Sequence, residues 1–165
     1  METASLSRPE DLLLRLRIEA FMADYAHCLD TDRLEAWPDF FTEDARYRVC
    51  TRENYDRKLP LSVMSCSGRG MFRDRICALR TANVFEPHVY CHITGTLRII
   101  RSSPGQVQTE SNFQVVRTMV DGTMSIFACG RSLDTITIQN EALKLAERTV
   151  VLDSQSIDTL LVIPL

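Results

Sequence analysis

The sequence predicts an α+β fold, with helices early in the chain and strands late. Three observations carry this prediction: an apolar stripe at helical spacing near the N-terminus, a second apolar helical face in the middle, and long β-rich segments from position 88 onward. Helices and strands segregated in this way are typical of α+β domains. The simplest packing curls a strongly bent, mostly antiparallel sheet around the long first helix.

The first helix is predicted over Pro9–Leu29. Ser7 and Glu10 form a capping box at its start, in which each side chain reaches the backbone N–H of the other residue. The apolar residues behind this box recur every three or four positions, which places on one helical face Leu14, Ile18, Phe21, Met22, Tyr25 and Leu29.

A second, shorter helix is predicted to follow. The acidic turn at 30–32 ends the first helix and can cap the next one, which runs through Trp37. Pro38 then breaks or restarts that helix, because proline lacks the N–H that a helix interior requires.

The middle of the chain alternates between strand, loop and helix. A strand is predicted over Ala45–Thr51, followed by a polar loop over Arg52–Pro60 and a short strand or irregular segment over Leu61–Cys66. On the strand, one face carries Ala45, Tyr47 and Val49. A third helix is predicted over Met71–Ala82, and its apolar face comprises Met71, Phe72, Ile76 and Leu79.

The remainder of the chain reads as an antiparallel meander. A long β-rich segment covers His88–Ser102, and strands are predicted over Val107–Val120, Thr123–Gln139 and Leu143–Leu152. Asp121-Gly122 suits a tight hairpin turn, and Gly130 is the expected bend. The chain shows no linker or repeat, so one domain is expected to cover residues 1–165.

Composition excludes several classes of function. A net charge of −3 and a pI of about 5.6 argue against a general nucleic-acid binder. No apolar run is long enough for a membrane span, and the N-terminus lacks a signal-peptide pattern, so a cytoplasmic location is expected.

Arginine outnumbers lysine by 17 to two, which fits either subunit contacts or G+C-rich coding. The six cysteines form no CxxC pair and mostly have apolar neighbours, which predicts reduced, buried thiols.

Metal binding is disfavoured by geometry. His88, His92 and Glu86 resemble a site with two histidines and one carboxylate. Pro87 separates Glu86 from the histidines, however, and strand positions 88 and 92 are about 13 Å apart, too far to share one ion.

The sequence contains several residues that could serve in acid–base catalysis. An Asp and a His that face a pocket can abstract a proton, and the available residues are Asp44, Tyr47, His88 and His92. The alternative is structural, with Asp44 capping a turn, Tyr47 in the core and the histidines at a wet edge or an interface. Cys66 precedes a helix, which can favour a thiolate, although a buried structural thiol is the other interpretation.

Several ordered motifs resemble a known family. They include Asp30, Trp37-Pro38, Phe40-Phe41, Glu43-Asp44 and Tyr47, then the segment from Asp74 to Asn83, Glu86-x-His88-x-Tyr90-x-His92, Leu145-x-Glu147-Arg148, Asp153, and Asp158-Thr159-Leu160 through Pro164-Leu165. This set resembles the small (β) subunits of Rieske non-haem iron aromatic-ring-hydroxylating oxygenases. Within that family it is similar to the branch that serves aromatic acids such as terephthalate, salicylate and anthranilate.

The resemblance implies a cystatin-like (NTF2-like) cone and a structural role without catalytic residues, metal or cofactor in this chain. It implies a larger α subunit that holds a Rieske [2Fe-2S] cluster and a mononuclear non-haem iron. It also implies an α3β3 hexamer, served indirectly by a ferredoxin or reductase, with no nucleic acid or membrane as partner.

The resemblance also suggests an interface. The expected contact residues are Arg75, Arg80, His88, Tyr90 and His92, with ordinary solvated surface as the alternative. Cys91 stands where family members often carry arginine, so any contact made by that arginine is missing or replaced here. Two other functions stay open: a stand-alone dehydratase or isomerase that uses a His/Asp pair, and a ligand- or protein-binding module of the same fold.

Overall fold

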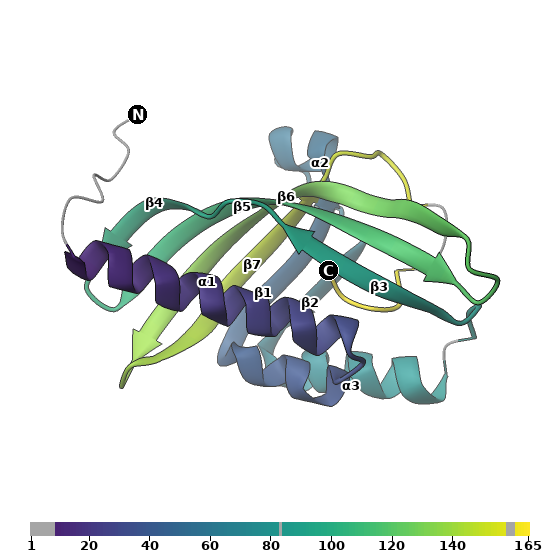
Figure 1. The fold of residues 1–165 in the computed structure, drawn as a ribbon, viewed down its shortest axis with the longest axis horizontal. Coiled ribbons are helices and arrows are strands. Elements are labelled where there is room, and N and C mark those ends of the chain that lie inside the picture. The colour runs from purple at the N-terminus through teal and green to yellow at the C-terminus, as the bar shows by residue number, and fades with distance from the viewer. Residues whose placement is uncertain (1–8, 83, 158–160) are drawn as a thin grey trace.

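The computed structural model describes residues 9–82, 84–157 and 161–165, and it shows an α+β fold (Figure 1). One seven-stranded sheet has the order β2-β1-β7-β6-β5-β3, and β4 pairs with β5 off this path. β1 and β7 run parallel, whereas the other pairs are antiparallel. The elements are α1 (Pro9–Asp30), the 3-10 helix η1 (Leu34–Phe40), β1 (Phe41–Thr51), α2 (Arg52–Asp56), β2 (Met64–Ser67), α3 (Gly68–Thr81), β3 (His88–Thr94), β4 (Arg98–Ser103), β5 (Gln106–Met119), β6 (Met124–Gln139) and β7 (Ala142–Leu152).

The N-terminal helices agree with the sequence pattern. The predicted stripe of α1 faces the core: Leu14 and Phe21 are partly buried, and the fully buried positions are Ile18, Met22, Tyr25 and Leu29. The predicted cap at Ser7 lies outside the described residues. The short second helix is present as η1, which contains Pro38 and ends where the Pro38 carbonyl accepts the N–H of Phe41.

Some of the predicted boundaries were wrong. β1 begins at Phe41 rather than Ala45. The predicted loop 52–60 contains α2, whose start is fixed by the Thr51 hydroxyl accepting the Asn54 N–H at 3.2 Å. The predicted β-rich segment over His88–Ser102 forms two strands, β3 and β4. The break occurs at Gly95, whose N–H donates to the Asn112 carbonyl at 2.7 Å, an approach that a side chain would crowd.

The core lies between the helices and the inward face of the sheet. Its centre is aromatic, with ring centroids 4.4 Å apart for Phe41 and Phe72 and 5.2 Å apart for Trp37 and Tyr47. The predicted inward residues Ala45, Tyr47 and Val49 are buried, as are three of the four residues predicted for the apolar face of α3. Met71 is the exception at 47% exposure, because its sulfur turns back to accept the Ser67 N–H.

The cysteines divide evenly between core and surface. All six are free, with Cys28, Cys50 and Cys66 buried and Cys77, Cys91 and Cys129 exposed. The expectation of mostly buried thiols was therefore wrong for half of them. Their apolar neighbours Ile76 and Ala128 take the inward positions, and the next residue along a helix or strand turns away. Within the described ranges, no helix is long and apolar enough to cross a membrane.

Candidate functional site

The interior beneath α1 is occupied by the chain itself. Residues 161–165 enter this interior, and four of the five side chains belong to the buried core: Leu161, Val162, Ile163 and Leu165. The main chain of Leu165 is held by two phenols. Its carbonyl accepts from Tyr25 at 3.0 Å and from Tyr47 at 3.1 Å, and its N–H donates to the Tyr47 oxygen at 2.9 Å.

These phenols stay neutral over a wide pH range. Burial raises the pKa of Tyr25 to about 12, although Arg148 nearby opposes the shift. Burial also raises the pKa of Tyr47 well above its ordinary value. The Trp37 indole N–H donates to the Tyr25 oxygen at 3.0 Å, so the hydroxyl of Tyr25 both donates and accepts a hydrogen bond. Both tyrosines are therefore donors to the C-terminal segment rather than general bases.

A buried ion pair lies beside the tyrosines. Arg148 on β7 contacts both carboxylate oxygens of Asp134 on β6 at 3.0 and 3.1 Å and the Ser132 hydroxyl at 3.1 Å. Its guanidinium carbon lies 4.5 Å from the centroid of the Tyr25 ring. Burial alone would lower the pKa of Arg148, but the negative charge of Asp134 raises it, so the guanidinium remains charged.

In the sequence, Arg148 stands out only as part of the Leu145-x-Glu147-Arg148 motif, which assigns no role to a pair with Asp134. The available signal was positional: Asp134 falls between Ser132 and Ile136 on the inward face of a strand, where a charge needs a partner.

The acid–base candidates do not meet around one cavity. Tyr47 lies in the core, as the structural interpretation expected. Asp44 does not cap a turn; it lies within β1, exposed, where its carboxylate accepts the Thr42 hydroxyl at 3.2 Å. Since Asp44 and Tyr47 lie on opposite faces of β1, the carboxylate points away from the interior that Tyr47 and the histidines face.

His92 instead pairs with Asp30, at the end of α1. The Asp30 carboxylate contacts His92 Nδ1 at 2.6 Å and accepts the backbone N–H of His92 at 3.0 and 3.1 Å. A carboxylate only accepts, so Nδ1 carries the proton and Nε2 of the neutral ring is an acceptor. Nε2 is buried and has no hydrogen-bond partner within the described parts of the chain. Asp30 was a motif residue in the sequence, but its pairing required the tertiary fold.

His88 is held in a similar way. Its Nδ1 lies 2.7 Å from the Glu86 carbonyl, so that nitrogen donates and Nε2 is left as a buried acceptor. The ring lies 4.7 Å from that of Tyr90, centroid to centroid. It also borders a mostly apolar cavity of about 300 Å³ between α1, α3 and β3, whose other lining residues include Leu29, Leu79, Phe85, Tyr90 and Ile163. Asp30, the partner of His92, also lines this cavity, as do Asp32 and Arg80, whereas His92 and Asp44 do not.

A metal centre is not assembled by the described residues. No three of their His, Cys, Asp and Glu side chains gather closely enough to hold an ion. Glu86 meets His88 through its backbone carbonyl rather than its carboxylate.

The predicted interface residues are engaged within the chain. Arg75 donates to the Leu161 carbonyl, and Tyr90 is 4% exposed. Arg80 contacts the carboxylates of Glu35 and Asp32, each at 2.8 Å. The hydrogen bonds that Arg80 donates to the carboxylates of Glu35 and Asp32 raise its pKa. The structure places these residues without testing a subunit contact, so their interface role stays a prediction.

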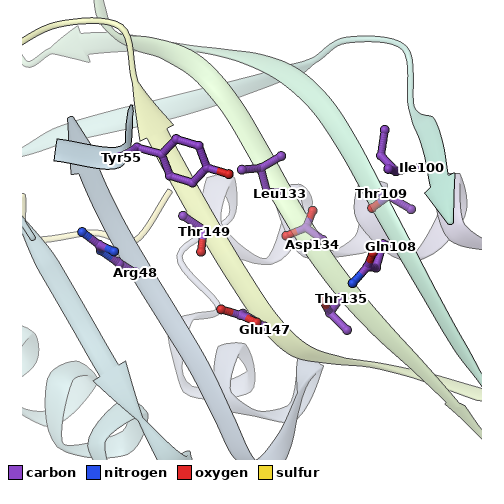
Figure 2. Close-up of a pocket in the computed structure, with 10 residues that line it drawn as sticks. All are labelled: Arg48, Tyr55, Ile100, Gln108, Thr109, Leu133, Asp134, Thr135, Glu147 and Thr149. Atoms are coloured by element: carbon purple, nitrogen blue, oxygen red, sulfur yellow. The ribbon is translucent and has the colours of Figure 1, made fainter. Parts of the chain in front are cut away.

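A larger cavity of about 390 Å³ lies on the outward side of the sheet (Figure 2). Figure 2 shows Arg48, Glu147 and Thr149 around it, with Tyr55 from α2 at one side. The Arg48 guanidinium is already used: it donates to the carbonyls of Leu59 and Leu61 and to the Ser62 hydroxyl. It therefore anchors the loop after α2.

The sequence of this chain matches a known protein family and two named proteins. The family model described as "Ring hydroxylating beta subunit" matches residues 25–159. The anthranilate 1,2-dioxygenase small subunit of Burkholderia cepacia is 36% identical over 94% of this chain and 97% of its own. Terephthalate 1,2-dioxygenase terminal oxygenase component subunit beta 2 of Comamonas sp. is 39% identical over 93% of this chain and all of its own.

Two solved structures have a fold similar to that of this chain. A β subunit assigned to an aromatic-ring-hydroxylating dioxygenase of Novosphingobium aromaticivorans has a TM-score of 0.85 at 36% identity, covering 92% of this chain and 96% of its own. A protein assigned as a scytalone dehydratase from the same species has a TM-score of 0.67 at 19% identity, covering 86% of each chain. The latter likeness concerns the fold alone.

Proposed function

Because this chain belongs to the family of ring-hydroxylating β subunits, we propose that it is the non-catalytic structural subunit of a multicomponent aromatic-ring-hydroxylating oxygenase. Its role is to assemble and stabilise the larger α subunits. The chain acts as one domain over residues 1–165, and its sheet curls into an NTF2-like cone around α1. The location is cytoplasmic.

One observation supports the structural role above the others: residues 161–165 occupy the interior beside Tyr25 and Tyr47, and the cavity that remains next to β3 is mostly apolar. In a stand-alone enzyme of this architecture, the space between the first helix and the sheet is where a substrate would meet acid–base groups. Here Leu161 and Leu165 occupy that space, and both phenols that face it bind the Leu165 main chain. Tyr47 is thereby committed to holding the fold together.

The redox chemistry is assigned to the partner. The Rieske [2Fe-2S] cluster and the mononuclear non-haem iron would reside in the α subunit of an α3β3 hexamer, with electrons arriving from a ferredoxin or reductase. The relatives act on anthranilate and terephthalate by name, so the substrate class proposed here is an aromatic carboxylate. Both molecules carry a carboxylate on a benzene ring, which is the chemical feature that the substrate pocket of the partner would recognise.

The experiment is purification of the untagged complex from the native host, followed by native mass spectrometry and a visible absorption spectrum. The expected result is an equimolar complex of this chain with a larger, red-brown chain, in the mass of a hexamer. After the two chains are separated, the visible absorption should follow the larger chain. A colourless homo-oligomer that contains no larger chain would overturn the proposal.

The second candidate is an acid–base enzyme, and one observation favours it. Asp30 and His92 form a carboxylate–histidine pair at 2.6 Å, with the far ring nitrogen left as an unpartnered acceptor among the described residues. Such a pair can act as a general base. For this candidate the chain alone should dehydrate or isomerise a substrate, and His92→Ala should abolish turnover without unfolding the chain. Turnover that survives His92→Ala would exclude it.

A further inference from the structure

The two faces of strand β3 differ in character. His88, Tyr90 and His92 point into the molecule, where their rings contact one another and Asp30. The odd-numbered residues point outward, with Val89 60% and Ile93 52% exposed, and Cys91 between them is exposed as well. The strand thus presents an apolar row to solvent.

This row continues across the sheet onto β6. Strand register places Val116 between Cys91 and Ile126, Thr118 between Val89 and Met124, and Gln114 between Ile93 and Cys129. Residues directly opposite in a sheet lie on the same face. The result is an outer β3–β6 patch, bridged by β5 and formed by Val89, Cys91, Ile93, Met124, Ile126 and Cys129.

The patch is both exposed and free of charge. Met124 is 71% and Ile126 is 64% exposed, and none of the residues that form or bridge the patch carries a formal charge. Further along the same outward side the sheet becomes charged, with Glu110 paired to Arg98 at 3.6 Å and to Arg131 at 3.5 Å. A contiguous apolar surface without charges marks an interaction site, and its lack of charge matches the core of a protein interface.

We propose that the outer β3–β6 patch is where the larger α subunit docks, through an apolar surface of that subunit. The inference rests on the proposed function and gives it a location. Because the patch offers no charge to pair, its partner surface must be apolar rather than an acidic or basic segment. The relatives are named as one kind of subunit of a dioxygenase, so contact with an unlike subunit is the association that family membership implies. In Figure 1 the β5–β6 hairpin and the start of β3 extend past the end of α1.

The native cysteines provide the first test, without any mutation. Cys91 and Cys129 lie in the patch, whereas Cys77 is exposed on α3 and serves as the internal control. Alkylation of the free chain and of the αβ complex with iodoacetamide, read by peptide mass spectrometry, gives three rates in each state. Cys91 and Cys129 are expected to react at least about tenfold more slowly in the complex, while Cys77 keeps its rate.

Three outcomes would overturn the inference. Equal rates for Cys91 and Cys129 in the free chain and the complex would exclude the patch as a docking site. Protection of Cys77 alone would place the contact on α3. Unreactive Cys91 and Cys129 in a homo-oligomeric free chain, still unreactive in the complex, would assign the patch to a second copy of this chain.

Substitution provides an independent test. Ile126→Asp puts a charge at the centre of the patch, and Leu61→Asp is the matched control, because Leu61 is also 64% exposed and lies in the loop before β2. Both variants should keep the wild-type circular dichroism and unfolding midpoint. Ile126→Asp is expected to weaken binding to the larger subunit at least about thirtyfold, as loss of a central interface residue does, whereas Leu61→Asp stays within threefold. Wild-type binding with no effect of Ile126→Asp would refute the patch alone, whereas a wild-type chain that binds no larger subunit would refute the proposed function.

Discussion

Removing the hydroxyl of Tyr47 tests whether the C-terminal segment is locked into the interior. In Tyr47→Phe, the ring keeps its packing against Trp37, but the Leu165 N–H loses its acceptor at 2.9 Å. The Leu165 carbonyl keeps its bond from Tyr25 at 3.0 Å, so only the N–H is left without a partner.

The magnitude follows from burial. Leu165 is 1% exposed, so water cannot replace the lost acceptor without opening the core. A buried donor left unsatisfied costs about 1–3 kcal/mol, so the free energy of unfolding should fall by about that amount. For a chain of 165 residues, this corresponds to about 2–4 °C in the unfolding midpoint for each kcal/mol.

The assay is urea unfolding of the full-length chain followed by tryptophan fluorescence, because the sole tryptophan, Trp37, lies in this network. Tyr55→Phe is the matched control. The Tyr55 ring, rather than its hydroxyl, meets Arg131, with 5.4 Å between the guanidinium carbon and the ring centroid, so this variant should change stability by less than about 0.5 kcal/mol. A Tyr47→Phe loss below about 0.5 kcal/mol, or an equal loss in both variants, would refute the reasoning.

Three further predictions concern the same interior. The raised pKa of Tyr25, about 12, means that only the unfolded chain releases this proton between about pH 10 and 12, so Tyr25 alone should lower stability there by about 1.4 kcal/mol per pH unit. Tyr47, whose pKa burial also raises, adds to this fall, and a flat profile in denaturant titrations would contradict the burial. Arg148→Met leaves Asp134 buried without its partner, so the free energy of unfolding should fall by about 3–5 kcal/mol. Combining Arg148→Met with Asp134→Leu should recover much of that loss. Equal stability of the single and double variants by calorimetry would argue against the pair. Gly130→Ala would place a Cβ 2.0 Å from the Val151 carbonyl oxygen, so the free energy of unfolding should fall by at least about 1–3 kcal/mol. In the control variant Gly70→Ala the new Cβ meets no atom within 4 Å, so that change should be neutral or stabilising. Equal unfolding midpoints for the two variants would contradict this prediction.

The sequence predicted the elements that depend on local periodicity. The stripe on α1 and the alternation of Ala45, Tyr47 and Val49 follow from repeats of 3.6 and 2 residues, so the core faces of α1 and β1 could be assigned in advance. The break at Gly95 could not be assigned, because it depends on contact with Asn112, which is distant in sequence. The short helix α2 was missed because a polar stretch of five residues carries little periodicity, although Thr51 offered a capping signal.

In the candidate site, too, the sequence indicated individual residues but not the contacts between them. The motif residues Asp30, Tyr47 and His92 were all singled out in the sequence, but only the fold shows that Asp30 binds His92 and that Tyr47 binds Leu165. Asp44 and Tyr47 belong to one short strand segment, and the resulting placement on opposite faces separates two residues that acid–base chemistry would need together.

The most direct test of a non-catalytic β subunit is turnover by the assembled complex with one histidine of this chain changed. Complexes of the α subunit with His88→Gln or with His92→Gln should be compared with wild type at equal content of assembled hexamer, using anthranilate or terephthalate as substrate. The prediction is a kcat within about twofold of wild type for both variants, because the chemistry resides in the partner. A loss of about a hundredfold or more in an intact hexamer, in the range that removal of a general base produces, would contradict it.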